Sequence, residues 1–168
     1  GIHANGITFV RSLAEKNPDI YREKLSDGRS FGEALLSPTH LYVSLVRSLL
    51  EAGLDLRYMV NITGHGWRKL MRATADFTYV IDVVPPAQAE FGFMQERAAA
   101  DDSEMYGNFN MGAGFAVYLP AAQAEQVVEL AAALQLKAWI AGTVEAGPKQ
   151  VVIKPKNITF AGDTLEVR

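Results

Sequence analysis

Two glycine-containing junctions hold the residues of this sequence that are best suited to ligand binding. Thr63-Gly64-His65-Gly66 joins a strand pattern to a helix pattern, and His3-Ala4-Asn5-Gly6 precedes another helix pattern. Such a turn can point several backbone N–H groups at one position, and the following helix N-terminus adds partial positive charge. The junctions therefore predict an anionic ligand, and two of them could face the same ligand. The alternative is that glycine serves only the geometry of tight turns.

Basic and histidine side chains beside the junctions would strengthen anion binding. Arg68 and Arg72 are four residues apart and share a helix face, and arginine can hold phosphate through two hydrogen bonds. His3 and His65 could contact the ligand or handle a proton. The predicted ligand-binding residues are His3, Asn5, Gly6, Thr63, Gly64, His65, Gly66 and Arg68. The alternatives are a solvated basic helix face and exposed loop histidines.

Other reactive sites find little support in the residue types. The chain has no cysteine, and its three histidines do not occur at metal-ligand spacing, so no metal site is predicted. Ser30 has no His or Asp partner at a recognisable spacing for a hydrolase triad. Neither a Walker-type phosphate loop nor a GxGxxG turn that opens a βαβ unit is present. No catalytic residue is assigned.

Composition limits the classes of protein to which this chain can belong. The 168 residues, 49% hydrophobic and 21% charged, predict a single globular domain over residues 1–168. A net charge of −3 argues against a nucleic-acid surface. No apolar run reaches the roughly 20 residues that span a bilayer, and no signal peptide is recognisable, so a cytoplasmic protein is predicted. Because the chain opens on Gly1, we interpret it as a piece whose partner lies upstream.

Strand and helix patterns alternate along the chain and predict an α+β domain, in which helices flank a mixed sheet in α/β/α layers. Helices are predicted over 7–15, 31–36, 45–52, 67–73, 87–98, 102–106 and 121–134. Strands are predicted over 41–43, 56–62, 76–82, 115–119, 138–144, 151–154, 158–160 and 165–167. Predicted helix caps are Asn5, Asn17 before Pro18, Ser30 with Glu33 in a capping box, and Ser44.

Several motifs, in order along nearly the whole chain, resemble the C-terminal domain of the aminoimidazole ribonucleotide synthetases, also called phosphoribosylformylglycinamidine cyclo-ligases. The motifs are His3-Ala4-Asn5-Gly6, Ser30-Phe31-Gly32-Glu33, Ser37-Pro38-Thr39, Asn61-Ile62-Thr63-Gly64-His65-Gly66 and Phe109-Asn110-Met111-Gly112. The resemblance implies an α/β/α domain that forms one wall of a cleft. The glycine junctions would then bind the ribose phosphate of the substrate, with their donors already in place.

The resemblance also implies an ATP-dependent ligase of purine biosynthesis that closes the imidazole ring of formylglycinamidine ribonucleotide. ATP would convert a substrate oxygen to a phosphate ester, which a substrate nitrogen then displaces. ATP and Mg²⁺ would be bound mainly by an N-terminal domain that builds a homodimer and is absent from this sequence. The isolated chain is therefore expected to be inactive.

Two features depart from the family pattern. His65 stands where the family has the middle glycine of Thr-Gly-Gly-Gly, and residues 67–70 replace a Pro-containing continuation. Two alternatives therefore stay open, because specificity rests on pocket shape. One is a non-catalytic phosphate-ligand binding or regulatory module of the same fold. The other is a related superfamily enzyme with another substrate.

Overall fold

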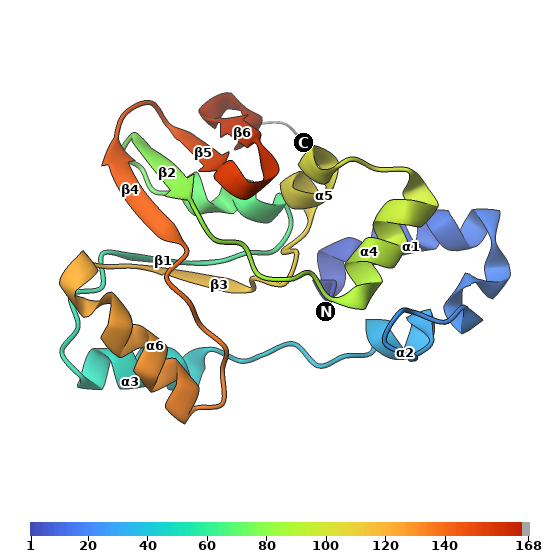
Figure 1. Ribbon diagram of the computed structural model, residues 1–168, viewed down its shortest axis with the longest axis horizontal. Coiled ribbons are helices and arrows are strands. Elements are labelled where there is room, and N and C mark those ends of the chain that lie inside the picture. The colour runs from blue at the N-terminus through green and yellow to red at the C-terminus, as the bar shows by residue number, and fades with distance from the viewer. Residues whose placement is uncertain (166–168) are drawn as a thin grey trace.

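A four-stranded mixed sheet and a separate two-stranded ribbon form the β part of the structure (Figure 1). The computed structural model describes residues 1–165, with the side chain of Asn5 outside that description. The sheet has the order β4 (Gly142–Ala146), β2 (Phe77–Ile81), β5 (Gln150–Ile153) and β6 (Ile158–Ala161). β2 and β5 run parallel, and the other two pairs are antiparallel. The ribbon pairs β1 (Tyr58–Asn61) with β3 (Phe115–Tyr118) in antiparallel fashion.

Helices cover these strands in two groups (Figure 1). The α-helices within residues 1–165 are α1 (His3–Lys16), α2 (Phe31–Leu35), α3 (Val43–Glu51), α4 (Ala89–Ala98), α5 (Asp102–Asn108) and α6 (Ala124–Ala133). Short 3-10 helices occupy Pro18–Arg22, Gly66–Met71, Ala121–Gln123, Lys154–Lys156 and Gly162–Leu165. α3 packs on α6 beside the ribbon, whereas α1, α2 and α4 gather at the other end of the molecule. The predicted α+β class with a mixed sheet is confirmed.

The apolar core has two parts that follow this grouping. The larger part joins α1, α4, α5 and the 3-10 helix Gly66–Met71 to the sheet, and it includes fully buried Phe31, Trp67, Met71, Phe91 and Met105. The smaller part lies between α3 and α6 and contains Leu45, Leu49, Leu54 and Ala131. Burial of apolar surface in the larger part stabilises the packing of α1 on α4 and thereby fixes the position of their first turns.

Local capping signals in the sequence form as predicted. Ser30 Oγ accepts a hydrogen bond from Glu33 N at 3.2 Å, and Glu33 Oε2 accepts one from Ser30 N at 2.6 Å, which is a complete capping box. Asn17 Oδ1 accepts from Asp19 N at 3.2 Å, directly ahead of the 3-10 helix that begins at Pro18. These interactions span two or three residues, so the sequence alone can specify them.

The prediction of a strand over residues 41–43 is wrong. Residues 37–42 have no regular structure, and α3 begins at Val43 with Tyr42, rather than Ser44, at its N-cap position. A strand needs a partner, and no named strand of residues 1–165 pairs with this segment. The cap predicted at Asn5 is also wrong, because α1 already begins at His3.

Other boundaries shift for similar reasons. β4 begins at Gly142 rather than at residue 138, because Gly142 pairs with Ile81, where β2 ends. The helix predicted over 67–73 is the 3-10 helix Gly66–Met71. Of the strand predicted over 165–167, Leu165 ends a 3-10 helix, and residues 166 and 167 lie outside the described residues.

A partly buried tyrosine, Tyr118, makes stability sensitive to alkaline pH. The Tyr118 hydroxyl donates to Leu70 O at 2.9 Å, and burial, together with nearby Tyr79 and Tyr58, raises the pKa of Tyr118 well above its ordinary value. The folded state thus keeps a proton that the unfolded chain loses near pH 10. The free energy of unfolding should therefore fall above about pH 10, by up to about 1.4 kcal/mol per pH unit for this group.

Urea unfolding between about pH 7 and pH 11 measures this dependence. Tyr118→Phe should lower stability by about 1 kcal/mol at neutral pH, because the hydrogen bond is lost, and should flatten the alkaline decline. Tyr21→Phe, at an exposed position, is the control. An equally steep decline in Tyr118→Phe and the wild type would contradict the argument.

Candidate functional site

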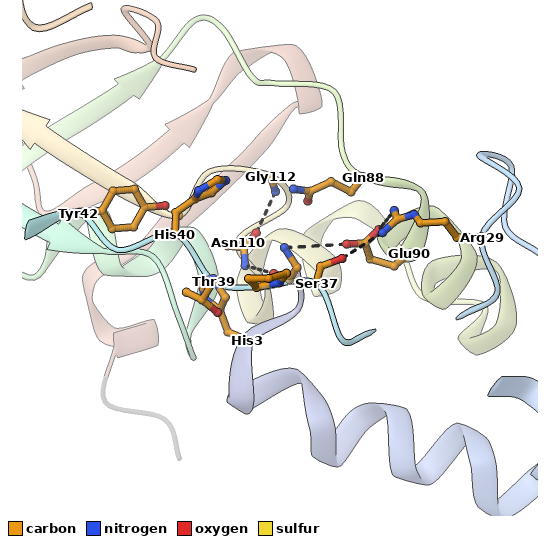
Figure 2. Close-up of a pocket in the computed structure, with 13 residues that line it drawn as sticks. His3, Arg29, Ser37, Thr39, His40, Tyr42, Gln88, Glu90, Asn110 and Gly112 are labelled. Carbon is orange, nitrogen blue, oxygen red and sulfur yellow. Dashed lines mark hydrogen bonds and ion pairs between the residues drawn. The ribbon is translucent and has the colours of Figure 1, made fainter. Parts of the chain in front are cut away.

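A hollow of about 170 Å³ opens where five separate parts of the chain meet (Figure 2). They are the start of α1, Arg29 just ahead of α2, residues 37–42, the first turn of α4 and the turn 110–114. The lining residues are Gly1, His3, Arg29, Ser37, Pro38, Thr39, His40, Tyr42, Gln88, Glu90, Asn110, Gly112 and Gly114. Most of these side chains are polar, so the hollow suits a ligand with several hydrogen-bonding groups.

Asn110 holds the walls of the hollow together (Figure 2). Its buried side chain donates to Gly1 O at 2.9 Å and accepts from Gly112 N at 3.0 Å. Its main-chain oxygen accepts a hydrogen bond from Trp67 Nε1 at 2.9 Å. Because Trp67 directly follows Gly66, Asn110 ties the second glycine junction to the start of α1.

The turn 110–114 brings backbone unusually close to its neighbours. Gly112 has φ of +96°, a conformation that favours glycine, and a Cβ there would lie 3.2 Å from Pro86 O. A Cβ at Gly114 would overlap the Tyr42 hydroxyl, and the Tyr42 ring stacks on Phe115 with centroids 4.8 Å apart. A side chain at either position would therefore crowd these neighbours, and glycine avoids this at the wall of the hollow.

Arg29 links two carboxylates at the edge of the hollow. Its Nη2 lies 2.6 Å from Asp27 Oδ2 and 3.2 Å from Glu90 Oε2, and its Nη1 donates to Ser37 Oγ at 3.0 Å. The hydrogen bonds from Arg29 lower the pKa of Asp27. The Asp27 side chain is 38% exposed, whereas that of Glu90 is only 1% exposed. Arg29 therefore connects the surface to a buried acid.

The first glycine junction lies partly at the hollow. His3, with φ of +58°, lines it, and partial burial lowers the pKa of its imidazole below the ordinary value of 6.5. Gly6 is buried against Ile2, and a Cβ on Gly6 would lie 2.9 Å from Ile2 Cβ. The side chain of Asn5 lies outside the described residues. Ligand binding by His3, Asn5 and Gly6 stays a prediction.

The second junction lies behind Asn110 and does not line the hollow. His65 and Gly66 have φ of +72° and +51°, so His65 adopts the conformation that favours glycine. Gly66 packs directly on the backbone of α5. Lys69 Nζ donates to Thr63 Oγ1, and burial lowers the pKa of Lys69. Phosphate binding by Thr63, Gly64, His65 and Gly66 stays a prediction.

The Arg68 side chain turns toward the protein interior. Its Nη1 donates to Gly107 O at 3.1 Å, and its guanidinium lies 4.8 Å from the centroid of the Phe160 ring. Its Nε is buried without a hydrogen-bond partner among the described residues. Arg68 thus connects the 3-10 helix Gly66–Met71 to α5 and β6 in this structure, and its contact with phosphate stays a prediction.

The positions of Arg29 and Glu90 at this site were not predicted from the sequence, and no role was predicted for Asn110. Arg29 and Glu90 are 61 residues apart, and no local pattern joins them. Asn110 stood within the Phe109-Asn110-Met111-Gly112 motif, which was a usable signal. Within residues 1–165, no group of three or more His, Asp or Glu side chains could hold a metal ion, and no helix is long and apolar enough to cross a bilayer.

Comparison with known proteins agrees with the resemblance. A family model described as AIR synthase related protein, C-terminal domain, matches residues 1–154. The chain is similar to proteins named phosphoribosylformylglycinamidine cyclo-ligase. That of Methanococcus maripaludis (strain C7) is 35% identical over 147 residues, which is 86% of this chain and 42% of the relative. That of Methanopyrus kandleri is 37% identical over 152 residues, 90% of this chain and 43% of the relative. The chain thus spans about two fifths of these relatives.

Proposed function

Because the chain belongs to the AIR synthase related protein family, as its C-terminal domain, we propose that it is the substrate-side part of an ATP-dependent cyclo-ligase. The reaction proposed is closure of the imidazole ring of formylglycinamidine ribonucleotide in purine biosynthesis. One observation supports it above the others. Motif residues that are far apart in the sequence, namely His3, Ser37, Thr39, Asn110 and Gly112, meet around one polar hollow.

The role of this chain in the reaction is to bind and orient the substrate. Asn110 holds the N–H of Gly112 and the start of α1 in place before a ligand arrives, so little reorganisation is needed. Burial keeps His3 neutral at pH 7, where its imidazole can both donate and accept. We further propose that the substrate phosphate binds at Thr63–Gly66, where the Lys69 ammonium beside Thr63 adds a cation.

ATP, when bound, supplies the phosphoryl group that makes a substrate oxygen a leaving group. Mg²⁺ takes several oxygen ligands around one point, and residues 1–165 offer no such set of acidic side chains. We therefore assign ATP and Mg²⁺ to an N-terminal domain. A homodimer and a cytoplasmic location belong to the same proposal.

The test joins this chain to an N-terminal ATP-binding domain, in cis or in trans, and measures ADP. Release of ADP that requires formylglycinamidine ribonucleotide is expected, with no turnover by the isolated chain. Asn110→Ala should lower kcat/KM about tenfold or more, because it frees the turn 110–114. Asn108→Ala, at an exposed position two residues away, is the matched control. Substrate binding without any ADP release would instead favour the regulatory module.

A further inference from the structure

Glu90 presents a buried carboxylate to the hollow with one oxygen unused (Figure 2). Oε2 accepts a hydrogen bond from Arg29 Nη2 at 3.2 Å. Oε1 has no hydrogen bond within the described part of the chain, and it lies 3.9 Å from the Gly1 nitrogen. This oxygen therefore has free acceptor capacity at the hollow, where a ligand that carries N–H groups could donate to it.

Glu90 shares the positive charge of Arg29 with Asp27. Arg29 is shared, because its Nε and Nη2 also lie 2.9 Å and 2.6 Å from Asp27 Oδ2. Two carboxylates therefore face one guanidinium, and a second positive charge comes only from the Gly1 nitrogen when it is a free ammonium. When that nitrogen is part of a peptide bond, one negative charge is left in excess. Among the lining residues within 1–165, Arg29 is the only lysine or arginine, and the pKa of His3 is lowered by burial. The N-terminus of α4 offsets only part of a buried charge. A ligand with a single positive charge would complete the balance.

We propose that Glu90 binds a cationic amidine through Oε1. An amidine is a strong base that is protonated at neutral pH, and its planar N–H groups match a carboxylate. The side chains of Asn110 and Gln88 line the same hollow and offer further hydrogen bonds. The identity of the natural amidine rests on the proposed function, since formylglycinamidine ribonucleotide carries this group. Recognition of an amidine by the hollow does not depend on it.

Saturation-transfer NMR with acetamidinium tests the site directly. The protein used is this chain fused to an N-terminal ATP-binding domain, so that the Gly1 nitrogen is a neutral amide. The methyl signal of acetamidinium should show transfer, and the neutral isostere acetamide should show little. Glu90→Gln should abolish the transfer, and Glu51→Gln, which alters an exposed ion pair with Arg47, should keep it. Equal transfer from acetamidinium and acetamide to the wild type overturns the proposal, even if Glu90→Gln does not fold.

Steady-state kinetics separate this proposal from the cyclo-ligase function. Glu90→Gln should raise KM for formylglycinamidine ribonucleotide about tenfold or more and leave KM for ATP unchanged, because a charged hydrogen bond to one substrate is lost. Unchanged KM in a variant that still releases ADP overturns the role of Glu90 but keeps the function. Glu90-dependent binding of acetamidinium without any ADP release by the wild type supports the site and overturns the function.

Discussion

A Gly66→Ala variant is expected to lose at least about 3 kcal/mol of unfolding free energy. Gly66 begins a 3-10 helix with φ of +51°, where any side chain is strained. An added Cβ would lie 2.8 Å from Asn108 N, 2.9 Å from Gly107 C and closer still to Tyr106 O. These are backbone atoms of α5 that cannot rotate away, so the two helices would have to separate.

Gly92→Ala is the matched control for this substitution. Gly92 lies on the exposed face of α4, and a Cβ there would meet no atom within 4 Å. Alanine is the better helix former by up to about 1 kcal/mol, so stability should stay equal or rise. Urea unfolding compares both variants with the wild type. A Gly66→Ala protein within about 1 kcal/mol of wild type would contradict the packing of α5 on the second junction.

Trp67→Ala is expected to cost about 3–5 kcal/mol. Trp67 is 2% exposed, meets Tyr106 edge to face with ring centroids 5.2 Å apart, and donates from Nε1 to Asn110 O. The substitution removes a large buried side chain and leaves the Asn110 oxygen without this partner. Trp67→Phe keeps most of the volume, so its smaller loss, about 1–3 kcal/mol, reports mainly on the hydrogen bond.

Trp139→Ala is the control that measures the effect of removing a tryptophan side chain elsewhere in the chain. Trp139 is only half-buried, and its Nε1 donates to Val83 O at a longer 3.3 Å. Its replacement should cost clearly less than that of Trp67. Thermal unfolding and the ADP assay of the two-domain enzyme are the measurements. Because Trp67 holds Asn110, Trp67→Phe should also lower kcat/KM, whereas Trp139→Phe should not. Similar losses at both positions would show that the link through Asn110 has no special role.

Interactions between near neighbours could be predicted from the sequence. The capping box of Ser30 and Glu33 and the cap of Asn17 form because each closes within three residues. The helical pattern after Pro120 and the aromatic and β-branched run of β2 also indicated their elements correctly. The ordered motifs likewise indicated the family, which the family-model match over residues 1–154 confirms.

Elements that need a distant partner could not be predicted in this way. Residues 41–43 have strand-forming side chains, yet they lie in no sheet of the described structure. The start of β4 depends on where β2 ends, about 60 residues earlier in the chain. Side-chain type sets only a preference for extended backbone, and pairing decides whether a strand forms.

The sequence by itself determined the helix starts at Pro18 and Phe31, with their caps, and the presence of two glycine junctions with histidine at both. Only the tertiary structure decided how these parts are used. It placed His3 at a polar hollow, packed Gly66 against α5, and turned Arg68 toward Gly107. It also brought Glu90 to Arg29 across 61 residues. The physical reason is that backbone geometry follows from neighbouring residues, whereas burial and charge pairing depend on segments that meet only after the chain has folded.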